Sequence, residues 1–281
     1  MKKIILPTDF SENATNAIRY ALHLFQGVET TFHLLHTYTP PVFQVENLFY
    51  KPSEDNLIDS YQRRAYEKLG VLRKQLEREF DNPEYTFELH GVFNTLPEEV
   101  HYMAIREDAD LVIMGSQGAT GATEILFGNN ATHVIRRASC PLIVVPSGYT
   151  YKAPKTVGFP SDYEIDYDKE QLQQLLDICE KYDSKIDVMH VSSGYDLTEE
   201  QLRNKQKLKQ LLEHTPNAFH KLRDQGVIEA INAFKSDRPM DLLVMIRTKH
   251  TFFQRLFVEP VIKKIGLQVN IPFMVIPHED K

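Results

Sequence analysis

The stretch GSQGATGATEILFGNN, residues 115–130, contains four glycines and separates two apolar runs of the chain. Gly115, Gly118 and Gly128 have the spacing G-x2-G-x9-G, with the first pair after an expected strand and the last before an expected helix. Glycine lets a backbone approach a ligand closely, and a helix N-terminus offers unpaired N–H groups and a positive dipole end. The pattern predicts a phosphate cradle. Two tight turns that need glycine for their own geometry are the alternative.

Familiar phosphate and catalytic motifs are missing from the sequence. No glycine is followed by lysine, which excludes a Walker P-loop, and Gly115, Gly118 and Gly121 do not form the G-x-G-x-x-G dinucleotide fingerprint. There is no G-x-S-x-G elbow or H-E-x-x-H motif, and Asp9 is the one obvious carboxylate at the expected mouth of the site. We therefore expect a protein that is not an enzyme, with weak hydrolysis of a bound phosphate compound left open.

Metal-binding patterns are also missing. His33 and His36 occupy an expected strand, where residues i and i+3 point to opposite faces and do not chelate one ion. Cys140 and Cys179 are far apart and in no CxxC pattern, so they are expected to be buried small apolar residues. No metal site is predicted.

Short apolar runs alternate with helical patterns through the first half of the chain. The expected strands cover 3–6, 31–37, 86–90, 111–114 and 142–145, and the expected helices 14–25, 57–80, 98–107 and 130–138. This alternation predicts a doubly wound, mostly parallel sheet with helices on both faces. Ligands bind such sheets at the carboxyl ends of strands, where the winding reverses. The segments PTDFS (7–11) and GSQG (115–118) fall at strand ends of this kind.

The chain repeats itself after residue 150. ILPTDFS is echoed by VGFPSDY, DLVIMG by DLLVMI, and CPLIVVP by IPFMVIP. The sequence therefore predicts two tandem α/β domains, 1–146 and 155–281, joined by a segment with two prolines and a glycine. The two C-terminal apolar runs are expected to adjoin, so that neither strand is an open edge.

Composition limits the partners. A net charge of −7 in 281 residues argues against sequence-independent binding to nucleic acid or to an anionic membrane. No run of about 18 apolar residues occurs, and Pro7 and Asp9 interrupt the apolar N-terminal run, so neither a membrane span nor a leader is expected. We expect a cytoplasmic protein.

The segments ILPTDFS, VIMGSQGATG and LFGNNATHVIRRASCPLIVVP, with the glycine spacing, resemble the universal stress protein family in its tandem form. The resemblance implies two five-stranded, mostly parallel sheets of the adenine-nucleotide alpha-hydrolase type, paired through their last strands. It also implies a stress-response protein whose first domain binds ATP, with Mg, or a related adenine nucleotide. The residues implied at that site are Pro7, Thr8 and Asp9 near the adenosine, Met114 against the nucleoside, and Gly115, Ser116, Gln117, Gly118, Gly128, Asn129 and Asn130 around the ribose and phosphates.

Two features keep a second interpretation open. The ATP-binding pattern has a hydroxyl residue after the third glycine and another two residues on, where this chain has Asn129 and Ala131. The second half keeps Asp162 but has Ile246, Lys249 and Val258 near the glycine positions, so it is not expected to bind nucleotide. The hypotheses are therefore a nucleotide-responsive regulatory module acting on an unknown protein partner, a scaffold with both sites vestigial, and, least favoured, an enzyme of the wider group. A further homodimer is left open, and residues 92–97 are expected to form a loop longer than the family usually has.

Overall fold

The computed structural model describes residues 1–39, 54–117, 128–191, 196–222, 227–247 and 270–278. The pattern of contacts divides them into two compact units. Unit 1 contains the described residues up to 140, and unit 2 contains those from 141 onward. Each unit is an open α/β sheet, as the sequence predicted.

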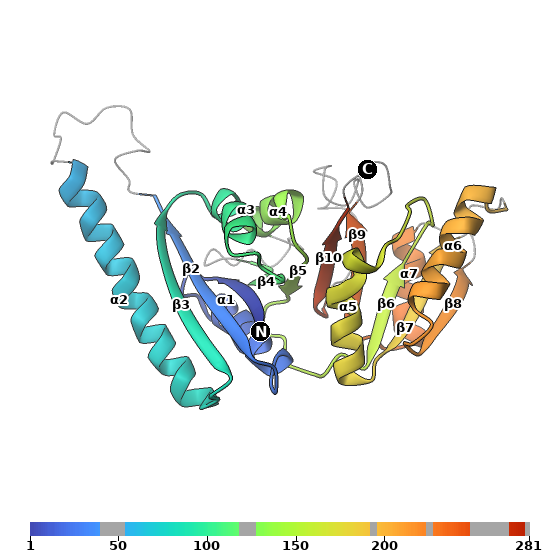
Figure 1. The fold of residues 1–281 in the computed structure, drawn as a ribbon, viewed down its shortest axis with the longest axis horizontal. Coiled ribbons are helices and arrows are strands. Elements are labelled where there is room, and N and C mark those ends of the chain that lie inside the picture. Colours follow the sequence, from blue (N-terminus) through green and yellow to red (C-terminus); the bar gives the residue numbers. More distant parts are fainter. Residues whose placement is uncertain (40–53, 118–127, 192–195, 223–226, 248–269, 279–281) are drawn as a thin grey trace. The chain divides into compact units, whose positions relative to one another are not determined.

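Unit 1 contains a parallel sheet with the strand order β3-β2-β1-β4 (Figure 1). Its strands are β1 (Lys2–Pro7), β2 (Thr30–Tyr38), β3 (Tyr85–Phe93) and β4 (Leu111–Gly115). Its helices are α1 (Glu12–Leu24), α2 (Glu54–Phe80), α3 (Leu96–Arg106) and α4 (Asn129–Arg137). The winding direction reverses between β1 and β4, which places a ligand-binding edge at the ends of these two strands.

The helices of unit 1 cover both faces of its sheet. Arg19 of α1 forms an ion pair with Glu79 of α2 at 2.7 Å, so these two helices share one face. Right-handed crossovers place α3 and α4, which contact each other, on the opposite face. The sheet is therefore buried on both sides, and strands β1 and β4 consist mainly of buried residues.

Unit 2 repeats this winding with the strand order β5-β10-β9-β6-β7-β8. Its strands are β5 (Leu142–Val145), β6 (Thr156–Pro160), β7 (Lys185–Val191), β8 (Asn217–Leu222), β9 (Leu242–Arg247) and β10 (Phe273–Pro277). Its helices are α5 (Lys169–Tyr182), α6 (Glu199–Leu211) and α7 (Val227–Asp237). All strand pairs are parallel except β5 with β10, which are antiparallel. This pairing confirms that the two C-terminal apolar runs adjoin.

The duplication extends to individual hydrogen bonds. The carboxylate of Asp110 accepts the backbone N–H of Lys3 at 2.8 Å, which ties the start of β4 to the start of β1. In unit 2 the carboxylate of Asp241 accepts the backbone N–H of Thr156 at 3.0 Å in the same way. The two halves of the chain therefore share side-chain interactions as well as the order of their elements.

The expected long loop at 92–97 is wrong. Phe93 still belongs to β3 and Leu96 already belongs to α3, which leaves Asn94 and Thr95 between them. Thr95 is the N-cap of α3, and Pro97 lies in its first turn, where a missing N–H costs no hydrogen bond. Val92 and Phe93 thus lengthen β3, which is the edge strand of the sheet, and the rest of the segment starts α3.

Two smaller expectations can be compared with the fold. Cys140 and Cys179 are buried as predicted, and burial raises the pKa of each thiol to about 12, so neither is a reactive thiolate at neutral pH.

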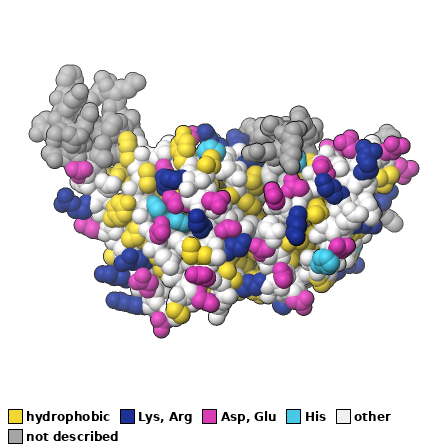
Figure 2. Space-filling view, in the orientation of Figure 1, with side chains coloured by type: hydrophobic (Ala, Val, Ile, Leu, Met, Phe, Trp, Pro, Cys, Tyr) yellow, Lys and Arg dark blue, Asp and Glu magenta, His cyan; other side chains and the backbone are white. Residues whose placement is uncertain are grey.

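Within the described ranges, no helix combines the length and apolarity that a bilayer crossing requires. Figure 2 shows acidic and basic side chains interspersed over the visible face.

Candidate functional site

The turn that follows β1 is built by its own polar side chains. Pro7 and Thr8 are buried and Asp9 is exposed. Thr8 Oγ1 accepts the N–H of Phe10 at 3.0 Å, and Asp9 Oδ1 accepts the N–H of Ser11 at 3.0 Å. These bonds hold Phe10 at a φ of 66°, a left-handed conformation that is uncommon for a bulky residue. Ser11 then caps α1 by accepting the N–H of Ala14.

Unit 2 contains the same turn. Ser161 Oγ accepts the N–H of Tyr163 at 3.1 Å, Asp162 Oδ1 accepts the N–H of Glu164 at 3.1 Å, and Tyr163 has a φ of 60°. The sequence of unit 2 lacks the glycine spacing of the first half. This turn is therefore a structural element of the repeat, and Asp9 has a local role that does not require a ligand.

A histidine supports the turn in each unit. His36 of β2 hydrogen-bonds through Nδ1 to the carbonyl of Thr8 at 2.8 Å, and its ring lies 4.6 Å from the ring of Phe10. His190 of β7 makes the corresponding 3.0 Å bond to the carbonyl of Ser161. Burial lowers the pKa of His36, although the bond to Thr8 partly opposes that shift. His36 is thus a neutral ring that supports the turn, on a strand position away from His33.

The end of β4 lies directly against the first turn of α1. Met114, Gly115 and Ser116 are buried and Gln117 is partly buried. The side-chain amide of Asn13 in α1 donates a hydrogen bond to the carbonyl of Gln117. A Cβ atom on Gly115 would lie 2.5 Å from Asn13 Nδ2 and 3.1 Å from the Asn13 carbonyl oxygen. Gly115 is therefore required first of all by the close passage of α1.

The glycine-rich segment is closed by a backbone hydrogen bond between its two ends. The N–H of Gly128 donates to the carbonyl of Ser116 at 2.7 Å. Gly128 is the N-cap of α4, with no side-chain cap bond, and the side chains of Asn129 and Asn130 are exposed. The first turn of α4 has no acidic residue, whereas Arg136 and Arg137 lie in its last turn. The first turn of α4 therefore contributes no carboxylate of its own that would offset the positive dipole end.

The structure brings most of the predicted site residues to one edge. Strands β1 and β4 are neighbours in register, with Ile4 opposite Leu111, so the Asp9 turn and the Gly115–Gln117 segment follow adjacent strand ends. Ser116 and Gly128 meet directly. Gly118 and Gly121 lie outside the described residues. Sequence reasoning missed Asn13, because nothing in the pattern shows that the first turn of α1 reaches β4.

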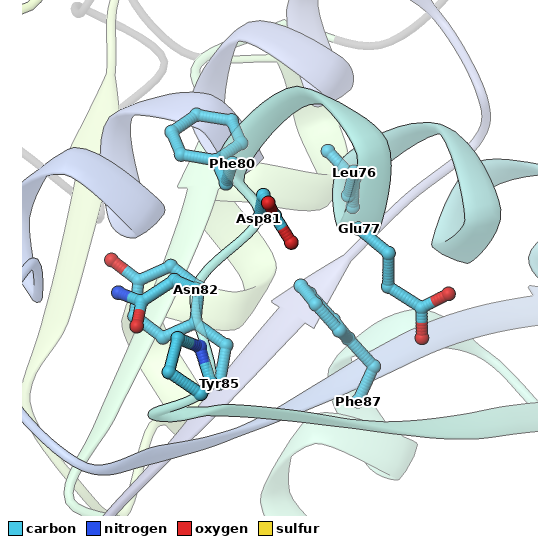
Figure 3. A pocket seen from close by; sticks show the side chains of 8 residues that line it. Leu76, Glu77, Phe80, Asp81, Asn82, Tyr85 and Phe87 are labelled. Carbon is cyan, nitrogen blue, oxygen red and sulfur yellow. The ribbon is translucent and has the colours of Figure 1, made fainter.

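Two cavities among the described residues lie away from the glycine segment. One cavity of about 380 Å³ is lined by Phe10 and Thr15 together with five residues of α2: Glu67, Lys68, Val71, Leu72 and Gln75. A smaller cavity, about 220 Å³, lies where α2 ends and β3 begins (Figure 3). Its lining includes Phe80, Asp81, Asn82 and Tyr85. Neither cavity contains a residue of the glycine segment.

Sequence comparisons match the first half of this chain to known proteins, and structural comparisons match its full length. The profile of the universal stress protein family matches residues 1–146. A universal stress protein from Methanocaldococcus jannaschii is 30% identical over 144 residues, which cover 51% of this chain and 81% of that protein. Universal stress protein G from Escherichia coli O157:H7 is 30% identical over 146 residues, which cover 51% of this chain and 98% of that protein.

Solved structures extend the similarity to the second half. A universal stress protein from Archaeoglobus fulgidus matches with a TM-score of 0.69 and 16% identity, covering 99% of this chain and 97% of that chain. At this level of identity the match concerns the fold alone. The whole chain therefore has the tandem architecture of that protein.

Proposed function

Because this chain belongs to the universal stress protein family, we propose that its first unit binds ATP or a related adenine nucleotide at the edge where β1 and β4 end. The observation that carries the proposal is the 2.7 Å bond between Gly128 N–H and the Ser116 carbonyl. This bond holds the end of β4 beside the uncapped N-terminus of α4, where unpaired N–H groups favour an anion.

The residues at this edge suit the parts of a nucleotide. The backbone N–H groups at Asn129 and Asn130 would bind phosphate, and both side-chain amides are exposed and able to donate further hydrogen bonds. Asp9 is exposed and offers a carboxylate for a ribose hydroxyl or the adenine amino group. Bound magnesium would be held mainly by the phosphates.

We propose a regulatory role without catalysis for this nucleotide. Asp9, the one carboxylate expected at the mouth, is engaged through Oδ1 by the N–H of Ser11. His36, the nearest imidazole to the turn, is engaged through Nδ1 by the carbonyl of Thr8. Both groups stabilise the turn through these hydrogen bonds, which gives each a structural role that requires no catalysis. Nucleotide binding would then act through altered affinity for a protein partner.

A scaffold function is the second candidate. Ala131 stands where the family's ATP-binding pattern has a hydroxyl residue. Its side chain is 2% exposed and packs into the unit. The antiparallel β5–β10 pair also forms without a ligand, and its strands are almost entirely buried. If unit 1 binds no nucleotide, this pairing and the helices around it are the place to look for function.

The nucleotide proposal can be tested by thermal unfolding of the full chain with magnesium and ATP, ADP or AMP. At 100 times its dissociation constant a ligand adds about 2.7 kcal/mol to the stability of the folded state. Gly128→Val should abolish this gain, because its branched side chain would occupy the approach to the α4 N–H groups. Gly128 has φ −60° and ψ 161°, which a residue with a side chain adopts without strain, so the variant should fold.

Gly128→Ser is the matched control, because serine is a good N-cap and is small beside a phosphate. It should keep the nucleotide-dependent gain. A gain that persists in Gly128→Val would place the ligand elsewhere. No gain in the unmodified chain with any of the three nucleotides would favour the scaffold.

A further inference from the structure

Three metal-ligating side chains meet on strands β2 and β3, outside the nucleotide edge. His33 Nδ1 lies 3.1 Å from His90 Nε2 and 3.4 Å from a carboxylate oxygen of Glu88. The same Glu88 oxygen lies 3.8 Å from His90 Nε2. His33 is buried, His90 is largely buried, and the side chain of Glu88 is half-exposed, which gives the cluster one side open to solvent.

We propose that His33, Glu88 and His90 form a binding site for a divalent transition-metal ion, with zinc(II) as the best fit. Zinc binds nitrogen and carboxylate oxygen at about 2.0–2.2 Å, and a tetrahedron of that size has ligand–ligand edges of about 3.3 Å. The three measured separations of 3.1, 3.4 and 3.8 Å lie around this value. Two imidazoles and one carboxylate leave a fourth position for water.

The strand register produces this cluster. In the parallel β2–β3 ladder His33 lies opposite Glu88, and His90 lies opposite Leu35. Glu88 and His90 are two residues apart, so their side chains share a face of the sheet. From the sequence, His33 could be compared only with His36 on its own strand, because the cross-strand partner cannot be recognised without the register. The signal in the sequence is the E-x-H pair at 88 and 90.

The protonation states suit a metal ion. Burial lowers the pKa of both His33 and His90, which favours the neutral imidazoles that bind metal ions. His33 Nδ1 and His90 Nε2 share a hydrogen bond, so the proton on one of these two nitrogens would move to the other nitrogen of its ring or leave when an ion binds. The nearby charges are mixed, since Glu88 and Glu107 favour a cation at His33 while Lys3 and Arg106 oppose it. His33 Nε2 is buried with no hydrogen-bond partner in the described part of the chain, so the ion would lack one supporting contact there. We therefore expect weaker binding than at a closed structural zinc site.

Unit 2 provides an internal comparison. The positions that correspond to His33 and His90 in the repeat are Asp187 on β7 and His220 on β8, whose side chains are bonded at 2.8 Å. The ammonium group of Lys185 lies 2.8 Å from the same Asp187 oxygen, where it supplies the positive charge. At these positions unit 2 therefore has an ion pair, whereas unit 1 has three side chains that can bind a metal ion and no lysine in the place of Lys185.

The test is titration of the full chain, freed of metal with a chelator and without nucleotide, with zinc(II) in a calorimeter and with cobalt(II) followed by visible absorption. We expect one ion per chain and the absorption of a tetrahedral cobalt(II) centre. Loss of even an outer-shell partner weakens metal binding about 10- to 100-fold, so His90→Asn should weaken it by about 100-fold or more. Glu88→Gln should weaken it by about tenfold by the same reasoning.

His220→Asn is the matched control, because His220 is 19% exposed against 18% for His90 and occupies the corresponding strand position. It should leave zinc affinity unchanged. Absence of saturable zinc or cobalt binding would overturn the proposal. Glu88→Gln changes a half-exposed side chain and should fold in any case, so unchanged zinc affinity in that variant would also overturn the proposed ligand set.

Discussion

Replacing Asp187 with alanine is expected to lower the free energy of unfolding by about 1.5–3 kcal/mol, because hydrogen bonds to a charged group are lost. The Asp187 side chain is 3% exposed and accepts hydrogen bonds from Lys185 Nζ and His220 Nε2, each at 2.8 Å. Its removal leaves the largely buried His220 Nε2 without its acceptor, whereas the half-exposed Lys185 ammonium can be solvated. Urea unfolding of the two proteins at pH 7 measures the difference.

Asp187 also predicts an acid-dependent loss of stability. Burial alone would raise the pKa of its carboxyl, but the hydrogen bonds from Lys185 and His220 outweigh that effect and lower it. A depressed folded-state pKa gives stability that is present above the unfolded value of about 3.9 and is lost as pH falls through the folded value. The difference in stability between the unmodified chain and Asp187→Ala should therefore shrink below about pH 4.

Asp166→Ala is the control for both measurements. Asp166 pairs with Lys207, but its side chain is 72% exposed, and exposed pairs contribute little. Its removal should change the free energy of unfolding by less than about 0.5 kcal/mol. Equal effects of Asp166→Ala and Asp187→Ala would show that burial of the Asp187 pair has no energetic consequence.

The elements of the first half of the chain could be predicted because its apolar periods are strong. The expected strand 142–145 coincides with β5, and the expected helix 130–138 differs from α4 by one residue at each end. The loop at 92–97 is shorter than expected, because Val92 and Phe93 continue β3 and Pro97 lies in the first turn of α3, where proline is well tolerated. Local chemistry of this kind decides where elements begin and end.

The site was harder to predict than the fold, because its contacts join residues far apart in the sequence. Gly115 suggested a close approach to a ligand, and the structure shows a close approach to Asn13. Asp9 suggested a ligand contact, and the matching turn at Asp162 shows that the repeat needs an aspartate there. His33 acquires a partner in His90 only through the register of two strands. Single residue types therefore had more than one explanation until their neighbours were known.

The contact between Gly115 and Asn13 gives a second large expected effect. Gly115→Ala should lower the free energy of unfolding by about 2–3 kcal/mol, as overpacking does. The new methyl group would lie 2.5 Å from Asn13 Nδ2, so the amide must move away from the Gln117 carbonyl that it binds. Asn13→Ala alone removes one hydrogen bond to a carbonyl, which costs about 1 kcal/mol.

The two changes together should cost less than the sum of their separate effects. In the double variant the Asn13 amide is gone, and the methyl group at position 115 then meets only the Asn13 carbonyl oxygen, at 3.1 Å. A double-mutant cycle by urea unfolding should therefore give a coupling of about 1–2 kcal/mol, with the double variant more stable than additivity predicts. Additive losses would mean that Gly115 is required by something other than Asn13. The double variant still lacks the hydrogen bond from Asn13 to the Gln117 carbonyl, so its nucleotide binding should stay weakened although its stability exceeds the additive value. This result would separate the structural need for Gly115 from the functional one.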